Sequence, residues 1–94
     1  MLSLSPLDLS KISKENLDRE IARIGMIAEL DATSLYEQLA EMTDNKDLKT
    51  VLLDIAKEEK THTSEFQTLL LRMDKEQEEE NAAGAEEVQK LTGK

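Results

Sequence analysis

The 94-residue sequence has no cysteine and no tryptophan, and it has only one proline, three glycines, one tyrosine and one phenylalanine. Without cysteine, the chain can form neither a disulfide bond nor a thiolate metal site. Few prolines and glycines disfavour a β-sandwich or barrel and favour long helices. With so few aromatic side chains, a monomer of this length could build only a modest core.

Positive charge and long apolar runs are scarce as well. Twelve Lys and Arg against 21 Asp and Glu give a formal net charge of −9. Nucleic acid is therefore not an expected partner, because binding it requires a basic face. No run approaches the ~18 apolar residues that span a membrane, and MLSLSPLDLS lacks the basic and apolar regions of a signal peptide. We therefore expect a cytoplasmic protein with no membrane contact.

Helix-breaking residues divide the chain into few segments. Residues 14–42 contain no breaker and come after Ser13, a good N-cap, so they are expected to form one helix. The segment TDNKD (43–47) predicts a turn, because its side chains hydrogen-bond their own backbone, and Asp44 or Asn45 can cap the next helix.

A second helix is expected over residues 46–73, followed by Asp74 as a stop and a new cap. Residues 75–92 are expected to form either a third helix or a tail. Residues 1–12, with five leucines or isoleucines around Pro6, are expected to form an ordered N-terminal arm. The short turn makes the two long helices antiparallel neighbours. The fold class predicted for residues 1–94 is thus a single all-α domain, a two-helix antiparallel hairpin plus a short C-terminal helix.

The second helix carries a stripe with alternating spacings of four and three residues, typical of a heptad pattern. Its members are Leu48, Leu52, Ile55, Glu59, His62, Phe66, Leu69 and Met73. All are apolar except Glu59 and His62, which belong to the segment EEKTH (58–62). The register places Glu59 on the stripe with His62, the only histidine of the chain, and leaves Glu58 off it.

The first helix is apolar on more than one side, most clearly at IGMIA (24–28). A helix of this kind must be buried on more than one side, which a single partner helix cannot do. We therefore expect the chain to self-associate, so that two hairpins form a four-helix bundle.

Glu29 is expected to lie level with the pair on the second helix. Counted from the turn near Asn45, Glu29 is about 16 residues back, and Glu59 and His62 are about 14 and 17 residues forward. Ferritin-like di-iron bundles take a Glu from each of two helices and a Glu-x-x-His from each of the other two. This chain therefore holds half of such a site, and a two-fold partner would complete it.

Other interpretations of these residues stay open. Glu59 and His62 could be a hydrogen-bonded pair that only fixes the register of a helical assembly. Tyr36, two turns after Glu29, could pack in the core or hydrogen-bond a ligand. Asp31 falls between Ala28 and Leu35 in an apolar stripe of the first helix, and it could be either an outer cation ligand or a simple helix acid. The acidic run EQEEEN (76–81) is interpreted as a solvated face.

The segments AELDATSLYEQL (28–39) and LLDIAKEEKTHTSEFQTLLLRMD (52–74) resemble the encapsulated ferritins, two-helix relatives of ferritin that work inside encapsulin nanocompartments. The resemblance covers roughly residues 14–92. It maps the metal ligands of the family onto Glu29, Glu59 and His62, and its site tyrosine onto Tyr36. Some relatives have a tryptophan where this chain has Leu35, or a glutamate where it has Ala28, which leaves Asp31 as the remaining acid of an outer metal site.

The resemblance implies a ferroxidase that oxidises Fe²⁺ with O₂ at a di-iron site shared between subunits, for mineralisation inside an encapsulin shell. It also implies dimers assembled into a ring, a homodecamer. The alternatives are a non-enzymatic helical oligomerisation module, or a di-metal protein with another metal or with peroxide chemistry.

Overall fold

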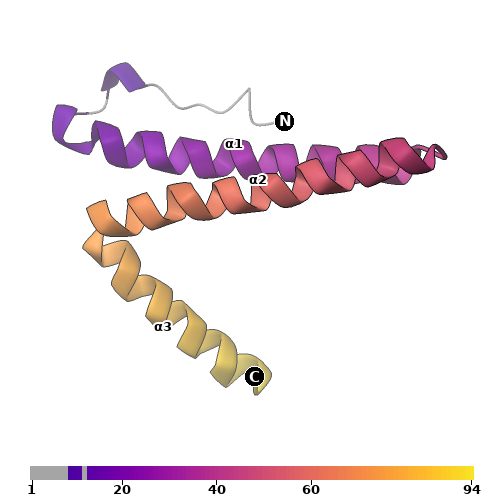
Figure 1. The fold of residues 1–94 in the computed structure, drawn as a ribbon. Coiled ribbons are helices and arrows are strands. Elements are labelled where there is room, and N and C mark those ends of the chain that lie inside the picture. Colours follow the sequence, from indigo (N-terminus) through magenta and orange to yellow (C-terminus); the bar gives the residue numbers. More distant parts are fainter. Residues whose placement is uncertain (1–8, 12) are drawn as a thin grey trace.

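The computed structural model describes residues 9–11 and 13–94, which form three α-helices (Figure 1). These are α1 (Lys14–Met42), α2 (Lys46–Met73) and α3 (Lys75–Thr92), preceded by a 3-10 turn, η2 (Leu9–Lys11). The described residues contain no strand, so the predicted all-α fold class is confirmed. The expected N-terminal arm lies outside the described residues except for η2.

The helices begin and end at residues suited to those positions. The Asn45 side chain accepts a hydrogen bond from the Leu48 backbone N at 2.9 Å and so caps α2. Asp74 ends α2 through its backbone N–H, bonded to the Leu70 carbonyl at 2.8 Å. Its carboxylate then caps α3 by accepting from the Gln77 backbone N at 3.1 Å. Ser13 precedes α1 as expected, but its hydroxyl makes no capping hydrogen bond.

The contact between α1 and α2 depends on small side chains. The buried apolar residues of the described chain are Ala22, Ala40, Ala56 and Leu70, and Thr33 is buried with them. Three of these four are alanines, which let two helices run close together along their length (Figure 1). The sequence stripe on α2 differs from this contact, because Ala56 and Leu70 lie one position from stripe members Ile55 and Leu69.

The larger apolar side chains of the hairpin remain partly uncovered. Exposed large apolar residues include Ile21 and Leu35 on α1 and the stripe members Leu48, Leu69 and Met73 on α2. In the block 24–28, four residues are only half-buried and Ala28 is exposed. A single hairpin therefore covers one side of these helices and leaves a second apolar side open, as the two-sided pattern of α1 predicts.

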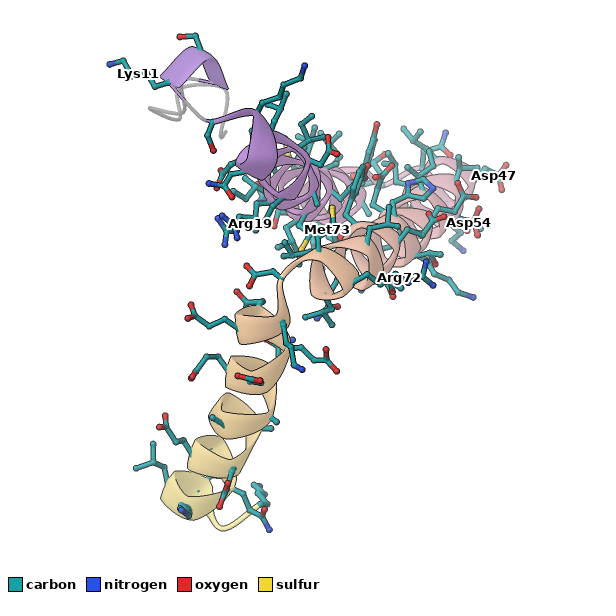
Figure 2. The ribbon with its side chains drawn as sticks, turned by 90° about the vertical axis from the view of Figure 1, so that its left-hand side faces the viewer. Lys11, Arg19, Asp47, Asp54, Arg72 and Met73 are labelled. Carbon is teal, nitrogen blue, oxygen red and sulfur yellow. The ribbon has the colours of Figure 1, made fainter. Side chains whose placement is uncertain are left out.

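Helix α3 leaves the end of α2 at an angle and diverges from the hairpin (Figure 1). Its side chains spread to all sides of the helix along its length (Figure 2). None of its residues is buried. The junction is held by Arg23 of α1, whose Nη2 donates to Oδ2 of Asp74 at 3.0 Å. In the described part of the chain, no helix is long and apolar enough to cross a membrane.

Candidate metal centre

Glu29 of α1 and Glu59 and His62 of α2 converge at the middle of the hairpin. Each offers one ligand atom, and these atoms all lie within 4.8 Å of one another. The His62 Nδ1 is 3.4 Å from Oε2 of Glu59 and 3.7 Å from Oε2 of Glu29. The structure thus brings together the three residues that counting outward from the turn places at one height.

The helical register explains why these side chains meet. Glu59 and His62 are three residues apart, so they lie on one face of α2, and α1 presents Glu29 to that face. Glu58 is exposed, whereas Glu59 is half-buried, so the two adjacent glutamates differ as the stripe predicts. The antiparallel hairpin therefore supplies one carboxylate from α1 and a carboxylate–imidazole pair from α2.

The cluster is open on one side. The side chains of Glu29 and Glu59 are 22% and 18% exposed, and that of His62 is 45% exposed. Beside them is a cleft of about 370 Å³ lined by Glu29, His62, Glu65, Phe66 and Leu69. Two carboxylates are thus partly withdrawn from water next to a space that can admit a ligand.

Neither carboxylate of the cluster has a strong counter-charge beside it in the described helices. Within the described helices, Glu29 and Glu59 pair only with His62, and no Lys or Arg forms an ion pair with either. Both distances to His62 exceed the usual 2.7–3.2 Å of a good N–H···O hydrogen bond. A cation bound between two half-buried carboxylates would stabilise them, because desolvation disfavours an unpaired charge.

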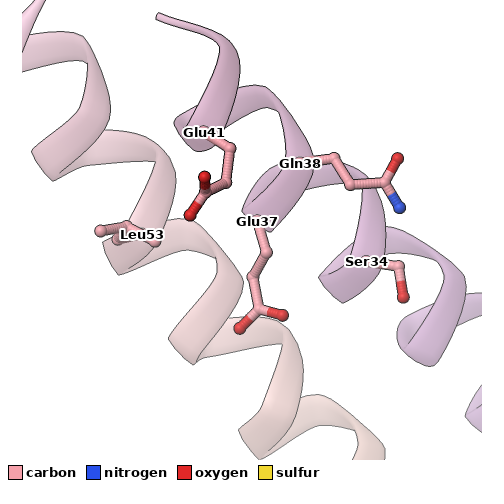
Figure 3. Close-up of a pocket in the computed structure, with 5 residues that line it drawn as sticks. All are labelled: Ser34, Glu37, Gln38, Glu41 and Leu53. Atoms are coloured by element: carbon pink, nitrogen blue, oxygen red, sulfur yellow. The ribbon is translucent and has the colours of Figure 1, made fainter.

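A second hollow, near the turn, shows what distinguishes this cluster from ordinary surface acids. About 360 Å³ in volume, it is lined by Ser34, Glu37, Gln38, Glu41 and Leu53 (Figure 3). Glu37 already pairs with Lys60 at 3.0 Å. The two glutamates form no three-residue ligand group with other described side chains. Acidic residues alone therefore do not make a comparable site.

Tyr36 and Asp31 lie on α1 outside the ligand cluster. Tyr36 is half-buried, and its hydroxyl has no hydrogen-bond partner among the described residues. Asp31 is half-buried too, and it joins no group of three potential ligands in residues 9–11 and 13–94. Neither residue is one of the three converging side chains.

The sequence pattern does not single out Thr33 and Thr63, two threonines near the cluster. The Thr33 hydroxyl donates to the Glu29 carbonyl at 2.9 Å, and the Thr63 hydroxyl donates to the Glu59 carbonyl at 3.0 Å. Each threonine comes four residues after its glutamate, a spacing that could have revealed the pairing. These bonds keep both hydroxyls satisfied at the helix contact without using the glutamate side chains.

Glu65 is likewise not predicted from the sequence as a residue of the site, although it comes three residues after His62 and lines the cleft. It is exposed and is not one of the three converging ligands. Only the three-residue spacing from His62 could have indicated that it borders the site.

Comparison with known proteins agrees with this architecture. The rubrerythrin family model matches residues 12–92. A ferritin-like–encapsulin shell fusion protein of Pyrococcus furiosus is 47% identical over 99% of this chain, and an encapsulin nanocompartment cargo protein of Myxococcus xanthus is 38% identical over 72%. The matched regions span only 28% and 55% of those two relatives.

A solved structure has the same fold. The crystal structure of the encapsulated ferritin domain from Pyrococcus furiosus aligns with a TM-score of 0.85 and 45% identity, covering 97% of this chain and 91% of that one. The matches in sequence and structure extend over both helices that bear the three ligands. The chain therefore belongs to the rubrerythrin family, as an encapsulated ferritin.

Proposed function

We propose that this protein is a ferroxidase that binds Fe²⁺ as its substrate and oxidises it to Fe³⁺ with O₂. The observation that carries the proposal is the convergence of Glu29, Glu59 and His62 within 4.8 Å. Around one ion with bonds of about 2.1 Å, adjacent ligands lie about 3.0–3.4 Å apart and opposite ligands about 4.2 Å apart, so the separations of 3.4 and 3.7 Å suit a shared ion.

The donor set fits iron. Carboxylate oxygens bind both oxidation states, and imidazole is a suitable nitrogen ligand for iron. Glu29 and Glu59 each offer two oxygens, so one of them can bridge two ions while the other binds at one side. Bound Fe²⁺ supplies the electrons, one from each ion, and dioxygen accepts them. The protein residues hold the two ions close together and compensate their charge.

One chain supplies only half of the ligands for a pair of ions. Ferritin-like di-iron sites use two single glutamates and two Glu-x-x-His pairs, and this hairpin contains one of each. The open side of the cluster and the exposed apolar residues of the stripes support completion by a second copy. We place the site between two hairpins related by a two-fold axis, in a four-helix bundle.

The names of two relatives support an encapsulin shell as the partner, and the ring follows from the family resemblance alone. One is named as a ferritin-like–encapsulin shell fusion and another as an encapsulin cargo protein. We propose that the dimers form a ring, a homodecamer, and work in the cytoplasm inside an encapsulin shell that stores the oxidised iron. A hairpin of two helices is too small to enclose a store of mineral by itself.

Tyr36 and Asp31 enter this proposal through the family resemblance. Tyr36 is assigned a catalytic part beside the site, since it lies two turns beyond Glu29 on α1. Asp31 is assigned an outer cation site on the same helix. Substituting Tyr36→Phe tests the phenolic hydroxyl without removing the ring, and Asp31→Asn tests the charge.

The two alternatives predict different behaviour from the same residues. A register device between Glu59 and His62 would need a short hydrogen bond in a buried position. The 3.4 Å separation between His62 Nδ1 and Glu59 Oε2 is longer than such a bond and weighs against it. A different metal or peroxide chemistry at the same ligands would preserve metal binding but not the oxidation of Fe²⁺.

The test is stopped-flow oxidation of Fe²⁺. Anaerobic protein loaded with two Fe²⁺ per dimer is mixed with air-saturated buffer, and the ferric absorbance is recorded over time. We expect a fast rise in wild type that Glu59→Ala and His62→Ala each slow by at least tenfold. The matched control is Glu58→Ala, which removes the adjacent exposed carboxylate and is expected to keep the wild-type rate. A wild-type rate equal to that of buffer would refute ferroxidase activity.

A further inference from the structure

We propose that Gly25 is a positioning residue for the metal centre: its missing Cβ lets the Phe66 ring lie against α1 and so sets the spacing between Glu29 and the pair on α2. The inference rests on the function proposed above and adds a residue that provides no ligand atom. Gly25 acts entirely through Phe66.

The contact between Gly25 and Phe66 leaves no room for a side chain. A Cβ placed on Gly25 would lie 2.7 Å from Cδ1 and Cε1 of the Phe66 ring and 2.8 Å from its Cγ. Carbon atoms pack favourably at about 3.5–4.0 Å, so these separations require something to move. Cγ is attached directly to the Phe66 Cβ, so the ring cannot avoid the clash by moving only its far end. Either the whole ring changes rotamer or the helices separate.

Both residues are one helical turn from metal ligands. Gly25 precedes Glu29 by four residues on α1, and Phe66 comes four residues after His62 on α2, so each shares a helix face with its ligand. The distance between α1 and α2 at this contact is therefore coupled to the distance one turn away, where the three ligands meet. A displacement of about 1 Å is large for a site whose ligands must be held within ~0.5 Å.

Phe66 is also a wall shared by two hollows. On one side it lines the ligand cleft with Glu29 and His62. On the other it lines an apolar groove of about 400 Å³ with neighbours that include Ile21, Leu69 and Met73. A ring that changed rotamer would have one of these spaces to enter, and entering the cleft would bring it against the ligands.

Glycine is an unfavourable choice in the interior of a helix, where alanine is preferred. Gly84 in α3 provides the comparison, since a Cβ added there meets no atom within 4 Å. Of the two glycines inside described helices, only Gly25 is therefore required by its surroundings. This makes Gly84→Ala a matched control for Gly25→Ala.

The experiment is a double-mutant cycle read by cobalt binding. Co²⁺ is titrated anaerobically into wild type, G25A, F66L and G25A/F66L, with G84A as the control, and the visible absorption bands report both affinity and ligand geometry. We expect G25A to weaken Co²⁺ binding by at least tenfold and to change the band positions. G84A is expected to match wild type, and F66L is expected to restore G25A to within about threefold of F66L alone.

The outcomes separate the role of Gly25 from the function of the site. Unchanged affinity and spectrum in G25A, with wild-type binding intact, would overturn the positioning role while leaving the metal centre in place. A wild type that fails to bind Co²⁺ would overturn the metal centre and this role with it. If G25A alone does not fold, the double variant decides: recovery of folding and Co²⁺ binding supports the proposal, and failure to recover them refutes it.

Discussion

The Asp74 carboxylate links all three helices, because its Oδ2 accepts from Nη2 of Arg23 at 3.0 Å while its Oδ1 accepts from the Gln77 backbone N at 3.1 Å. The first bond joins residues 51 apart in the sequence. The same residue ends α2 through its backbone N–H. Since α3 diverges from the hairpin beyond this junction, the bonds of Asp74 to Arg23 and Gln77 hold α3 where it leaves α2.

Replacing Asp74 by alanine removes both bonds at once. Loss of the N-cap costs about 0.5–2 kcal/mol. The Arg23 side chain is 39% exposed, so the ion pair adds no more than about 1 kcal/mol. We expect Asp74→Ala to lower the free energy of unfolding by about 1–3 kcal/mol, measured by urea denaturation at one fixed protein concentration. Asp74→Asn keeps a capping oxygen and loses the charge, so it should cost less than the alanine variant. Equal costs would contradict the capping role.

Asn45 provides a simpler test of capping, because it is exposed and makes no ion pair. Its side chain satisfies the Leu48 backbone N–H at the first turn of α2. Asn45→Ala should therefore destabilise the protein by about 1 kcal/mol. Asn45→Asp retains an acceptor and adds negative charge at a helix N-terminus, so it should be neutral or slightly stabilising. Both effects are measurable as shifts of the urea midpoint without a change in the slope.

The sequence predicts the helices well, because their limits depend on local chemistry. Asn45 and Asp74 cap helices at the positions where their side chains can reach a free backbone N–H. Glu29 lies at the same height as Glu59 and His62 because the two helices have the same rise per residue and are joined by a short turn. None of these features needs knowledge of packing.

The residues that form the contact between α1 and α2 are harder to predict from the sequence, because they depend on which side chains interdigitate. The heptad stripe on α2 includes Ile55 and Leu69, whereas the hairpin buries their neighbours Ala56 and Leu70. The large stripe residues lie on a surface that one chain leaves open. Hydrophobic periodicity alone therefore cannot distinguish the contact within the hairpin from the proposed contact between two hairpins. The clash that a Cβ on Gly25 would cause is likewise visible only once the Phe66 ring is placed.

Gly84 offers a stabilising substitution. It lies inside α3, and an added Cβ would meet no other atom within 4 Å. Because alanine loses less backbone entropy than glycine in a helix, Gly84→Ala should stabilise α3 by about 0.5–1 kcal/mol. Hydrogen exchange of the α3 amides provides a local measurement, and protection should increase there but not in α1. An unchanged or lower protection would indicate that α3 needs the glycine for a contact absent from the single chain.

The proposed dimer depends on apolar side chains that one hairpin leaves uncovered, and Leu69 of α2 is a clear example. Its side chain borders both the ligand cleft and the apolar groove, yet Leu69 is 48% exposed. Leu69→Glu should prevent association, because burying an unpaired carboxylate in an apolar interface costs several kcal/mol. We expect the hairpin to keep its helical circular dichroism while sedimentation velocity shows a smaller species.

Gln67→Glu is the matched control for that substitution, since it adds the same charge on the same helix at an exposed position off the stripe. It should sediment like wild type and retain ferroxidase activity, whereas Leu69→Glu should lose both the oligomer and the activity. Activity in a Leu69→Glu monomer would contradict a site shared between two chains. Loss of the oligomer in both variants would point to net charge, rather than the apolar stripe, as the controlling factor, and raising the ionic strength would then restore association in both.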